Sequence, residues 1–473
     1  RILTPKEFKE FGEFIKSPYS NKNENVVKLY NYIKSFYPDF DDPGLEKEQV
    51  YSAISGKKDY NDGFMRTLIF NLSKLCENFV CNTLRGEIEN EITLLDLYFK
   101  RGADKLVEKK MKQITDILQK EKTKDQYYFY CLYRIQAQKM AFNSKKRAFL
   151  NVKDFHEEDE MQTLDSLLNF YLLAALPEYR FFYNQANVVK LDFEFNFLDE
   201  IISFLKRSGF HKKTPELNLH FSALLLAKED SEKYYYDLKE IALNEIDNYR
   251  FGVQFNTIGL LANKAVREYF NGKDKFLEER FEIHNIIIEK GLYKKFEDGF
   301  FDDMLFKNIV IVGLQLNKIE WTEKFINDYI DKINPEDKEN AFHLNTARLL
   351  MYKNRFDEAL AHLNYIKNVN HVHYKTEMKI LSLIIFYEQN NFVSALGVID
   401  SYRHFLSNDA LIPDIRKERN YNFLKFTNDL IKVKENGVLN EAFGLEFEIK
   451  NTPNTYEKEW LLKKTKELIK NLQ

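Results

Sequence analysis

Residues 347–363 read ARLLMYKNRFDEALAHL, and 36 residues further on residues 383–399 read LIIFYEQNNFVSALGVI. The two stretches carry apolar, turn and small residues at the same spacing. The matched pairs are Leu350 and Phe386, Asn354 and Asn390, Phe356 and Phe392, Ala359 and Ala395, Leu360 and Leu396, and Leu363 and Ile399. A period in this range is typical of stacked helical hairpins, because no single hairpin can bury its apolar face alone. The repeat therefore predicts two successive hairpins, with helices at 340–352 and 356–367 and then at 374–388 and 392–405.

The order of residue types within the repeat resembles the tetratricopeptide repeat. In that family a small residue, a large one, a turn residue, an aromatic one and an alanine follow each other. The matching residues of the first copy are Ala347, Leu350, Asn354, Phe356 and Ala359. The second copy has Leu383 where the first has its small residue, and both copies lack the family's closing proline. The period also differs from the family's usual length of about 34 residues.

The resemblance becomes weaker outside this region. Clear similarity covers about 70 residues, and a fainter copy upstream includes Gly313, Trp321 and Phe325. The layout as a whole is similar to tetratricopeptide-type proteins of Bacteroidetes and Chlorobi. The resemblance implies an all-α fold in which helical hairpins stack into a right-handed α-α superhelix, preceded by an N-terminal helical unit.

The resemblance also implies where a partner binds. In tetratricopeptide proteins the first helices of the hairpins line a concave groove, and the groove positions of the two clear copies predict a set of partner-binding residues. These residues are Arg348, Met351, Tyr352, Ile384, Tyr387 and Glu388. The alternative for Tyr352 and Tyr387 is packing within the chain, since aromatic stripes at helical spacing usually face a core.

Composition favours long helices. Of the 473 residues, 44% are apolar, while Gly at 16 and Pro at 9 are well below the usual shares of about 7% and 5%. A chain of this length exceeds one compact core, so several domains or an elongated superhelix are expected. The expected parts are an N-terminal helical unit at 1–84, degenerate helical hairpins at 85–300, tetratricopeptide-like repeats at 301–410 and C-terminal capping helices at 411–473.

The N-terminal unit begins with a helix-start signal. In Thr4-Pro5-Lys6-Glu7 the threonine can cap the helix, the proline suits its first position and the glutamate completes a capping box. Short helices followed by a long one invite comparison with a DNA-binding helix-turn-helix. Residues 1–90 hold 13 Lys/Arg and 14 Asp/Glu, however, whereas a DNA-binding face is basic. The charge balance therefore disfavours nucleic acid as a partner.

Motifs for common enzyme chemistry are missing. The sequence has no Gly-rich phosphate loop, no His-Glu-x-x-His and no Gly-x-Ser-x-Gly. We therefore expect no enzymatic activity, no cofactor and no metal. The local histidine cluster of His362, His371 and His373 lacks the further ligands that zinc requires, so a turn between repeats explains it better.

Cysteine content and hydropathy bear on the compartment. The three cysteines, Cys76, Cys81 and Cys131, have no disulfide-framework spacing, which favours a reducing, cytoplasmic environment. The longest apolar stretch, 167–176, is far shorter than the roughly 20 residues that span a bilayer, so no membrane insertion is expected.

These observations predict a non-enzymatic scaffold or adaptor for protein–protein interaction, or a structural subunit of a larger assembly. A stack of helices would hold a preformed groove, so that a partner segment binds without the cost of ordering its site. The alternative is a transcription regulator that has an N-terminal DNA-binding unit and a tetratricopeptide-like sensor or oligomerisation region.

Overall fold

The structure is helical throughout the part of the chain that it describes. The computed structural model describes residues 2–84, 87–147, 157–189, 194–294, 299–367, 372–409 and 412–473. In these ranges every regular element is a helix, and extended pairing is limited to isolated bridges from Phe301 to Lys294 and Ile333. The all-α prediction is therefore confirmed.

The chain divides into two compact units. Unit 1 holds residues 1–121 and 127–168, and unit 2 holds residues 122–126 and 169–473. The finer division predicted at residues 84, 300 and 410 stays a prediction.

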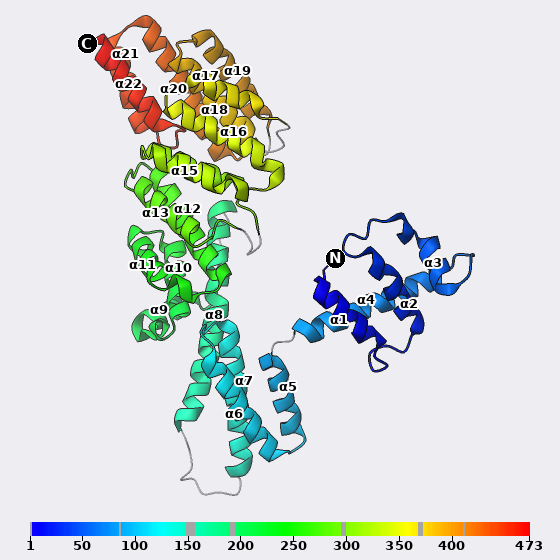
Figure 1. Cartoon of the computed structure of the whole chain (residues 1–473). Coiled ribbons are helices and arrows are strands. Elements are labelled where there is room, and N and C mark those ends of the chain that lie inside the picture. The colour runs from blue at the N-terminus through cyan, green and yellow to red at the C-terminus, as the bar shows by residue number, and fades with distance from the viewer. Residues whose placement is uncertain are drawn as a thin grey trace. The chain divides into compact units, whose positions relative to one another are not determined.

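Unit 1 combines short N-terminal helices with longer ones (Figure 1). Its helices are α1 (Pro5–Lys16), α2 (Glu24–Ile33), α3 (Lys47–Ser55), α4 (Asp62–Leu84), α5 (Glu87–Lys100), α6 (Asp104–Lys120), α7 (Gln126–Arg147) and the start of α8 (Glu157–Val189). The predicted capping box is present: the Thr4 hydroxyl accepts the Glu7 amide at 3.3 Å, and the Glu7 carboxylate accepts the Thr4 amide at 2.7 Å.

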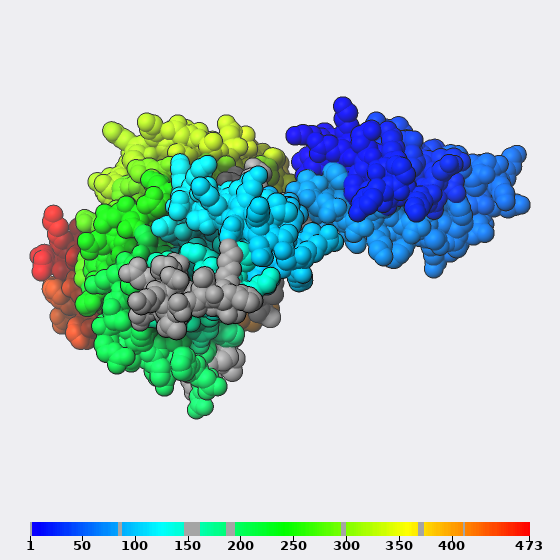
Figure 2. All heavy atoms as spheres, turned by 90° about the horizontal axis from the view of Figure 1, so that it is seen from below, coloured from blue at the N-terminus to red at the C-terminus, as the bar shows by residue number. Residues whose placement is uncertain are grey.

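Aromatic packing holds the first helices of unit 1 together. Phe11 and Ile15 of α1 pack with Tyr30 of α2 and Phe79 of α4. The buried Tyr30 hydroxyl donates to the Phe8 carbonyl at 2.7 Å, so its polar end is satisfied. In the space-filling view the atoms of α1–α4, deep to medium blue, form a closely packed body (Figure 2).

Unit 2 is a succession of helical hairpins (Figure 1). After the end of α8 its helices are α9 (Leu198–Ser208), α10 (Pro215–Glu229), α11 (Glu232–Glu245), α12 (Phe251–Phe270), α13 (Phe276–Glu289), α14 (Asp303–Gln315), α15 (Ile319–Tyr329), α16 (Pro335–Tyr352), α17 (Phe356–Tyr365), α18 (Val372–Glu388), α19 (Phe392–Asn408), α20 (Asp414–Asn436), α21 (Leu439–Asn451) and α22 (Lys458–Leu472). The two hairpins predicted from the repeat are α16 with α17 and α18 with α19, so both are confirmed.

The turn inside each of these hairpins has the same backbone geometry. Asn354 and Asn390 both have φ 57°, and Asn317, in the turn between α14 and α15, has φ 56°. The residue after each asparagine donates to the carbonyl five positions back, at 2.9 Å in all three turns. This is the Schellman ending of a helix, and asparagine is among the few side chains that tolerate the left-handed region. The fainter upstream copy therefore shares the turn of the two clear ones.

Small residues lie where the helices approach each other. Ala347 of α16, Ala359 of α17 and Ala395 of α19 are all fully buried. At Gly313 of α14 the approach is closer still, since an added Cβ would lie 2.4 Å from Thr322 Oγ1 and 3.2 Å from the Trp321 ring. Gly397 of α19 is the opposite case, with no atom within 4 Å of an added Cβ.

We therefore expect opposite effects of the same substitution at these two glycines. Gly313→Ala should lower the free energy of unfolding by about 1–3 kcal/mol, because the added methyl group overpacks the contact between α14 and α15. Gly397→Ala should raise it by roughly 0.5–1 kcal/mol, because alanine favours a helix interior. Urea unfolding of the full chain measures both. An unchanged stability of Gly313→Ala would contradict the close packing of these helices.

Candidate functional site

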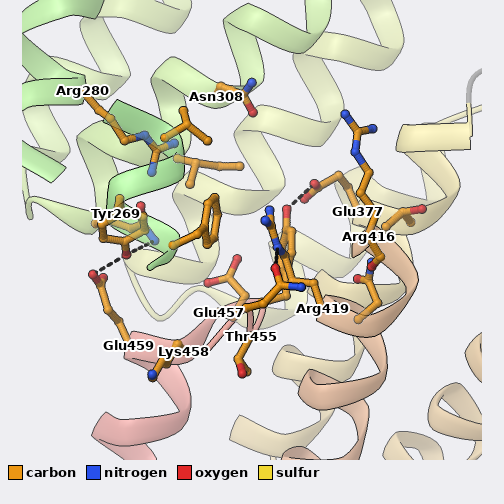
Figure 3. A pocket seen from close by; sticks show the side chains of 18 of the residues that line it. Tyr269, Arg280, Asn308, Glu377, Arg416, Arg419, Thr455, Glu457, Lys458 and Glu459 are labelled. Atoms are coloured by element: carbon orange, nitrogen blue, oxygen red, sulfur yellow. Dashed lines mark hydrogen bonds between the residues drawn. The ribbon is translucent and has the colours of Figure 1, made fainter. Parts of the chain in front are cut away.

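Unit 2 contains a pocket of about 640 Å³, a volume within the usual range of ligand sites. Helices α12, α13, α14, α18 and α20 line it, together with the segment 454–459 that leads into α22. Figure 3 shows side chains from these elements pointing into a common space. We call this site the unit 2 pocket. Its walls come from different hairpins, so the stacking of the hairpins creates it.

A buried ion network forms one side of the pocket. Arg348 of α16 is 1% exposed and donates to Glu457 at 2.6 Å and to Glu377 of α18. Lys307 of α14 donates to Glu377 at 2.9 Å, and the Tyr456 hydroxyl donates to the same carboxylate at 2.5 Å. Two cations thus face two carboxylates, and the network ties three helices to the segment before α22.

The network fixes the charge of its members. Burial by itself raises the pKa of Glu377, but the positive charges of Lys307 and Arg348 and the Tyr456 hydroxyl together lower it to about 2. Burial, followed by the charge of Glu377, raises the pKa of Tyr456 well above its usual value. Glu377 is therefore ionised and Tyr456 neutral at neutral pH.

Other walls of the pocket carry arginines of a different kind. Arg280 of α13 is 6% exposed, and its Nε has no hydrogen-bond partner. Its guanidinium lies 5.1 Å from the ring centroid of Tyr269 and 5.9 Å from that of Phe270. Arg419 of α20 lies 3.6 Å from the Phe270 centroid and donates from Nε to the Asn454 amide oxygen at 2.8 Å. Both arginines therefore contact the same aromatic ring.

Electrostatic strain accompanies this arrangement. Burial lowers the pKa of Arg280, the nearby Tyr269, Tyr456 and Glu459 raise it in part, and the charge of Arg419 lowers it further. Burial likewise lowers the pKa of Arg419, to which the charge of Arg416 adds. The lowered pKa values show that the positive charges are less well solvated than in water and that they repel one another.

Four of the six partner-binding residues predicted from the sequence are buried within the chain. Arg348 belongs to the network, and Met351, Ile384 and Tyr387 are buried. The Tyr387 ring packs on Trp460 with centroids 5.2 Å apart. In this conformation a partner cannot reach these four side chains. Tyr387 therefore packs within the chain, as the alternative interpretation of this residue expected. The role of these residues in partner binding stays a prediction.

The remaining two predicted residues are partly buried. Glu388 accepts from Trp460 Nε1 at 2.7 Å and from Lys464 Nζ at 2.8 Å, both on α22. Burial raises the pKa of Tyr352, with the charge of Glu457 adding to the shift. Arg348, Tyr387 and Glu388 thus contact α22 or the residues just before it.

Sequence reasoning missed Arg280, Arg416 and Arg419. They lie on α13 and α20, which are far apart in the chain and carry no repeat signal.

Other sequence hypotheses are placed by the structure without being tested. Arg66 of α4, in the N-terminal unit that was compared with a DNA-binding motif, pairs with Asp62 at 2.8 Å. His371 lies outside the described residues, while His362 faces His343 at 3.0 Å and His373 lies 3.0 Å from Asp303. Among the residues that the structure describes, no group of three or more His, Cys, Asp or Glu side chains has an arrangement that could hold a metal ion.

Comparison with protein-family models and with curated proteins gave no match. The resemblance to tetratricopeptide repeats therefore rests on the residues and turns described above. In the described ranges no helix has both the length and the apolar character needed to cross a bilayer.

Removing the central carboxylate should destabilise the chain. Glu377→Gln leaves Arg348 and Lys307 buried without full compensation, so we expect the free energy of unfolding to fall by about 3–5 kcal/mol at neutral pH. Urea unfolding of the full chain measures this. Glu358→Gln, which breaks the exposed pair with Arg355, is the matched control and should change little. A loss for Glu377→Gln as small as that of the control would contradict the network.

The pKa of Glu377 also predicts a pH dependence. It is lowered from 4.5 to about 2 in the folded chain, so its contribution to stability is complete above 4.5 and is lost as the pH falls towards about 2. The stability difference between the wild type and Glu377→Gln should therefore shrink across that window. A difference that stays constant from pH 5 to about 2.5 would show that Glu377 is not held ionised.

Proposed function

We propose that unit 2 is a right-handed, tetratricopeptide-like superhelix whose pocket binds a segment of a partner protein, and that the chain acts as a non-enzymatic scaffold or adaptor. Support for the repeat class comes from the contacts between helices. α14 contacts α16 and α16 contacts α18, so the first helices of successive hairpins are neighbours. The shared turn at Asn317, Asn354 and Asn390 adds to this support.

The pocket is the observation that carries the proposed binding function. Its lining comes from several hairpins and from the segment before α22, and all of these are held by buried packing. A site built in this way exists before the partner arrives, so little ordering cost opposes binding. The volume of about 640 Å³ suits a short stretch of side chains better than a whole domain.

The charges in the pocket favour binding over catalysis. A general acid or base works best when its pKa lies near the operating pH. The pKa of Glu377, at about 2, is far from that range, and its partners Lys307 and Arg348 hold it there. The network therefore acts as fixed charge and hydrogen bonding, which position a ligand without exchanging protons with it.

A blocked pocket tests this function. Asn308 of α14 lines the pocket and is labelled in Figure 3, so Asn308→Trp should fill the space with an indole ring. Val393 of α19 is 85% exposed and lies outside the lining, so Val393→Trp is the matched control. We expect affinity purification from cells of the source organism to recover a stoichiometric companion with the wild type and with the control.

With Asn308→Trp the same companion should be lost, while thermal unfolding of the variant shows that the chain is still folded. A companion retained by Asn308→Trp would contradict the pocket as the binding site. Recovery of no companion by any of the three chains would contradict the scaffold itself.

A further inference from the structure

Three arginines of the unit 2 pocket have no carboxylate partner among the described residues. Arg280 and Arg419 line it from α13 and α20, and the exposed Arg416 lies one turn before Arg419. None of the three forms an ion pair with a described carboxylate, in contrast to Lys307 and Arg348 in the same region. Unpaired charge inside a pocket is costly, especially at Arg280, which is more than nine-tenths buried. Such a charge points to a ligand that supplies the missing anion.

The aromatic wall keeps the guanidinium groups ready for that ligand. Arg280 and Arg419 both contact the Phe270 ring, and Tyr269 adds a second contact to Arg280. A guanidinium group that packs on a ring keeps N–H donors at its edge, and these match the two oxygens of a carboxylate. Figure 3 shows Arg280 reaching into the pocket from the side opposite Glu377.

The charge balance of the lining remains positive after its internal pairs are removed. Lys307 and Arg348 offset Glu377 and Glu457 within the network. Besides the three arginines, the lining contains Lys458, which donates to the carbonyls of residues 450 and 452 and forms no ion pair with a described carboxylate. On the acidic side, the described lining leaves the exposed Asp274 and Glu459, and Glu459 accepts the Tyr269 hydroxyl at 2.6 Å. Lys450, which also lines the pocket, pairs with Glu446 outside the lining. Four cations without an ion pair therefore exceed two carboxylates.

We propose that the unit 2 pocket binds an acidic segment of the partner protein, whose Asp or Glu carboxylates pair with Arg280, Arg416 and Arg419. This inference rests on the proposed function and adds the chemistry of the ligand. The cations come from two helices and lie along a cavity of about 640 Å³, so several carboxylates on one peptide reach more of them than one small anion does. Pairing also relieves the repulsion between Arg280 and Arg419.

Calorimetry with defined peptides tests the proposal on the full chain. We expect a capped hexaglutamate peptide to bind with an affinity that falls as salt rises, and a capped hexaglutamine peptide to bind at least about tenfold more weakly. Glutarate and inorganic phosphate are the small-anion probes and should also bind more weakly than hexaglutamate. Equal affinity for hexaglutamine, or equal affinity for either small anion, would overturn the acidic segment as the occupant.

Two substitutions place the binding in the pocket. Arg280→Met keeps the apolar length of the side chain and should weaken hexaglutamate binding about tenfold or more. Arg416→Gln removes an exposed charge, does not endanger folding and should weaken binding severalfold. Arg403→Gln removes one charge from the exposed face of α19 outside the pocket and should leave the affinity unchanged. An equal loss in the control would show that the peptide binds the surface nonspecifically.

Stability gives a readout that a structural role for Arg280 would not produce. An arginine whose role is to bind a ligand lowers the stability of the ligand-free chain, because its charge is buried without a partner. Arg280→Met should therefore unfold at the same temperature as the wild type or at a higher one. A lower unfolding temperature, with hexaglutamate affinity unchanged, would make Arg280 a structural residue and overturn the proposal.

The outcomes also separate this inference from the proposed function. If Asn308→Trp loses the companion and hexaglutamate does not bind, the pocket binds a protein segment that is not acidic. That outcome overturns the acidic ligand but not the proposed function. If Arg280→Met abolishes hexaglutamate binding but Asn308→Trp retains the companion, the pocket binds an acidic ligand. That outcome overturns the pocket as the scaffold's partner site.

Discussion

The ion pair between Arg348 and Glu457 is the constraint on which the C-terminal half of unit 2 depends. Arg348 is buried within a hairpin, and Glu457 lies 109 residues later, just before α22. Removing such charges from water costs several kcal/mol per ion, so the arrangement persists only because the opposite charges compensate each other. Glu377 completes it by accepting from Arg348, Lys307 and Tyr456. The segment before α22 is thereby held against the hairpins, where it becomes a wall of the pocket.

The pocket therefore combines two electrostatic regimes. In the network each cation has a carboxylate, and the low pKa of Glu377 reflects that compensation. Around Phe270 the arginines have aromatic and amide neighbours and form no ion pair with a described carboxylate, and burial lowers the pKa values of Arg280 and Arg419. The ion network stabilises the fold, because it anchors the segment before α22. The arginines around Phe270 have no such structural role, and their burial is a cost in stability that ligand binding can offset, in keeping with the trade-off between stability and function at binding sites.

Local signals in the sequence were enough to predict the hairpins and their turns. Asn354 and Asn390 were assigned to turns by their spacing, and both lie in the left-handed region because the Schellman ending requires it. Arg348 was singled out as a partner-binding position, and in the structure it pairs with Glu457 of the same chain. The pairing of Arg348 with Glu457, and the meeting of Arg280 with Arg419 over Phe270, depend on tertiary packing between distant helices. Periodicity within one helix contains no information about such contacts.

The backbone before α22 shows how the network and the pocket are coupled. Asn454 has φ 53° and Glu457 has φ 48°, so two residues within this short segment adopt the left-handed region. For a residue such as glutamate this conformation costs about 1–2 kcal/mol, and a glycine at 457 would avoid the cost. A glycine, however, could not reach Arg348, whereas Glu457 does so at 2.6 Å. Asn454 accepts Arg419 Nε in the same segment. The segment thus contacts the ion network through Glu457 and Arg419 through Asn454, so the same short stretch of backbone positions both parts of the pocket.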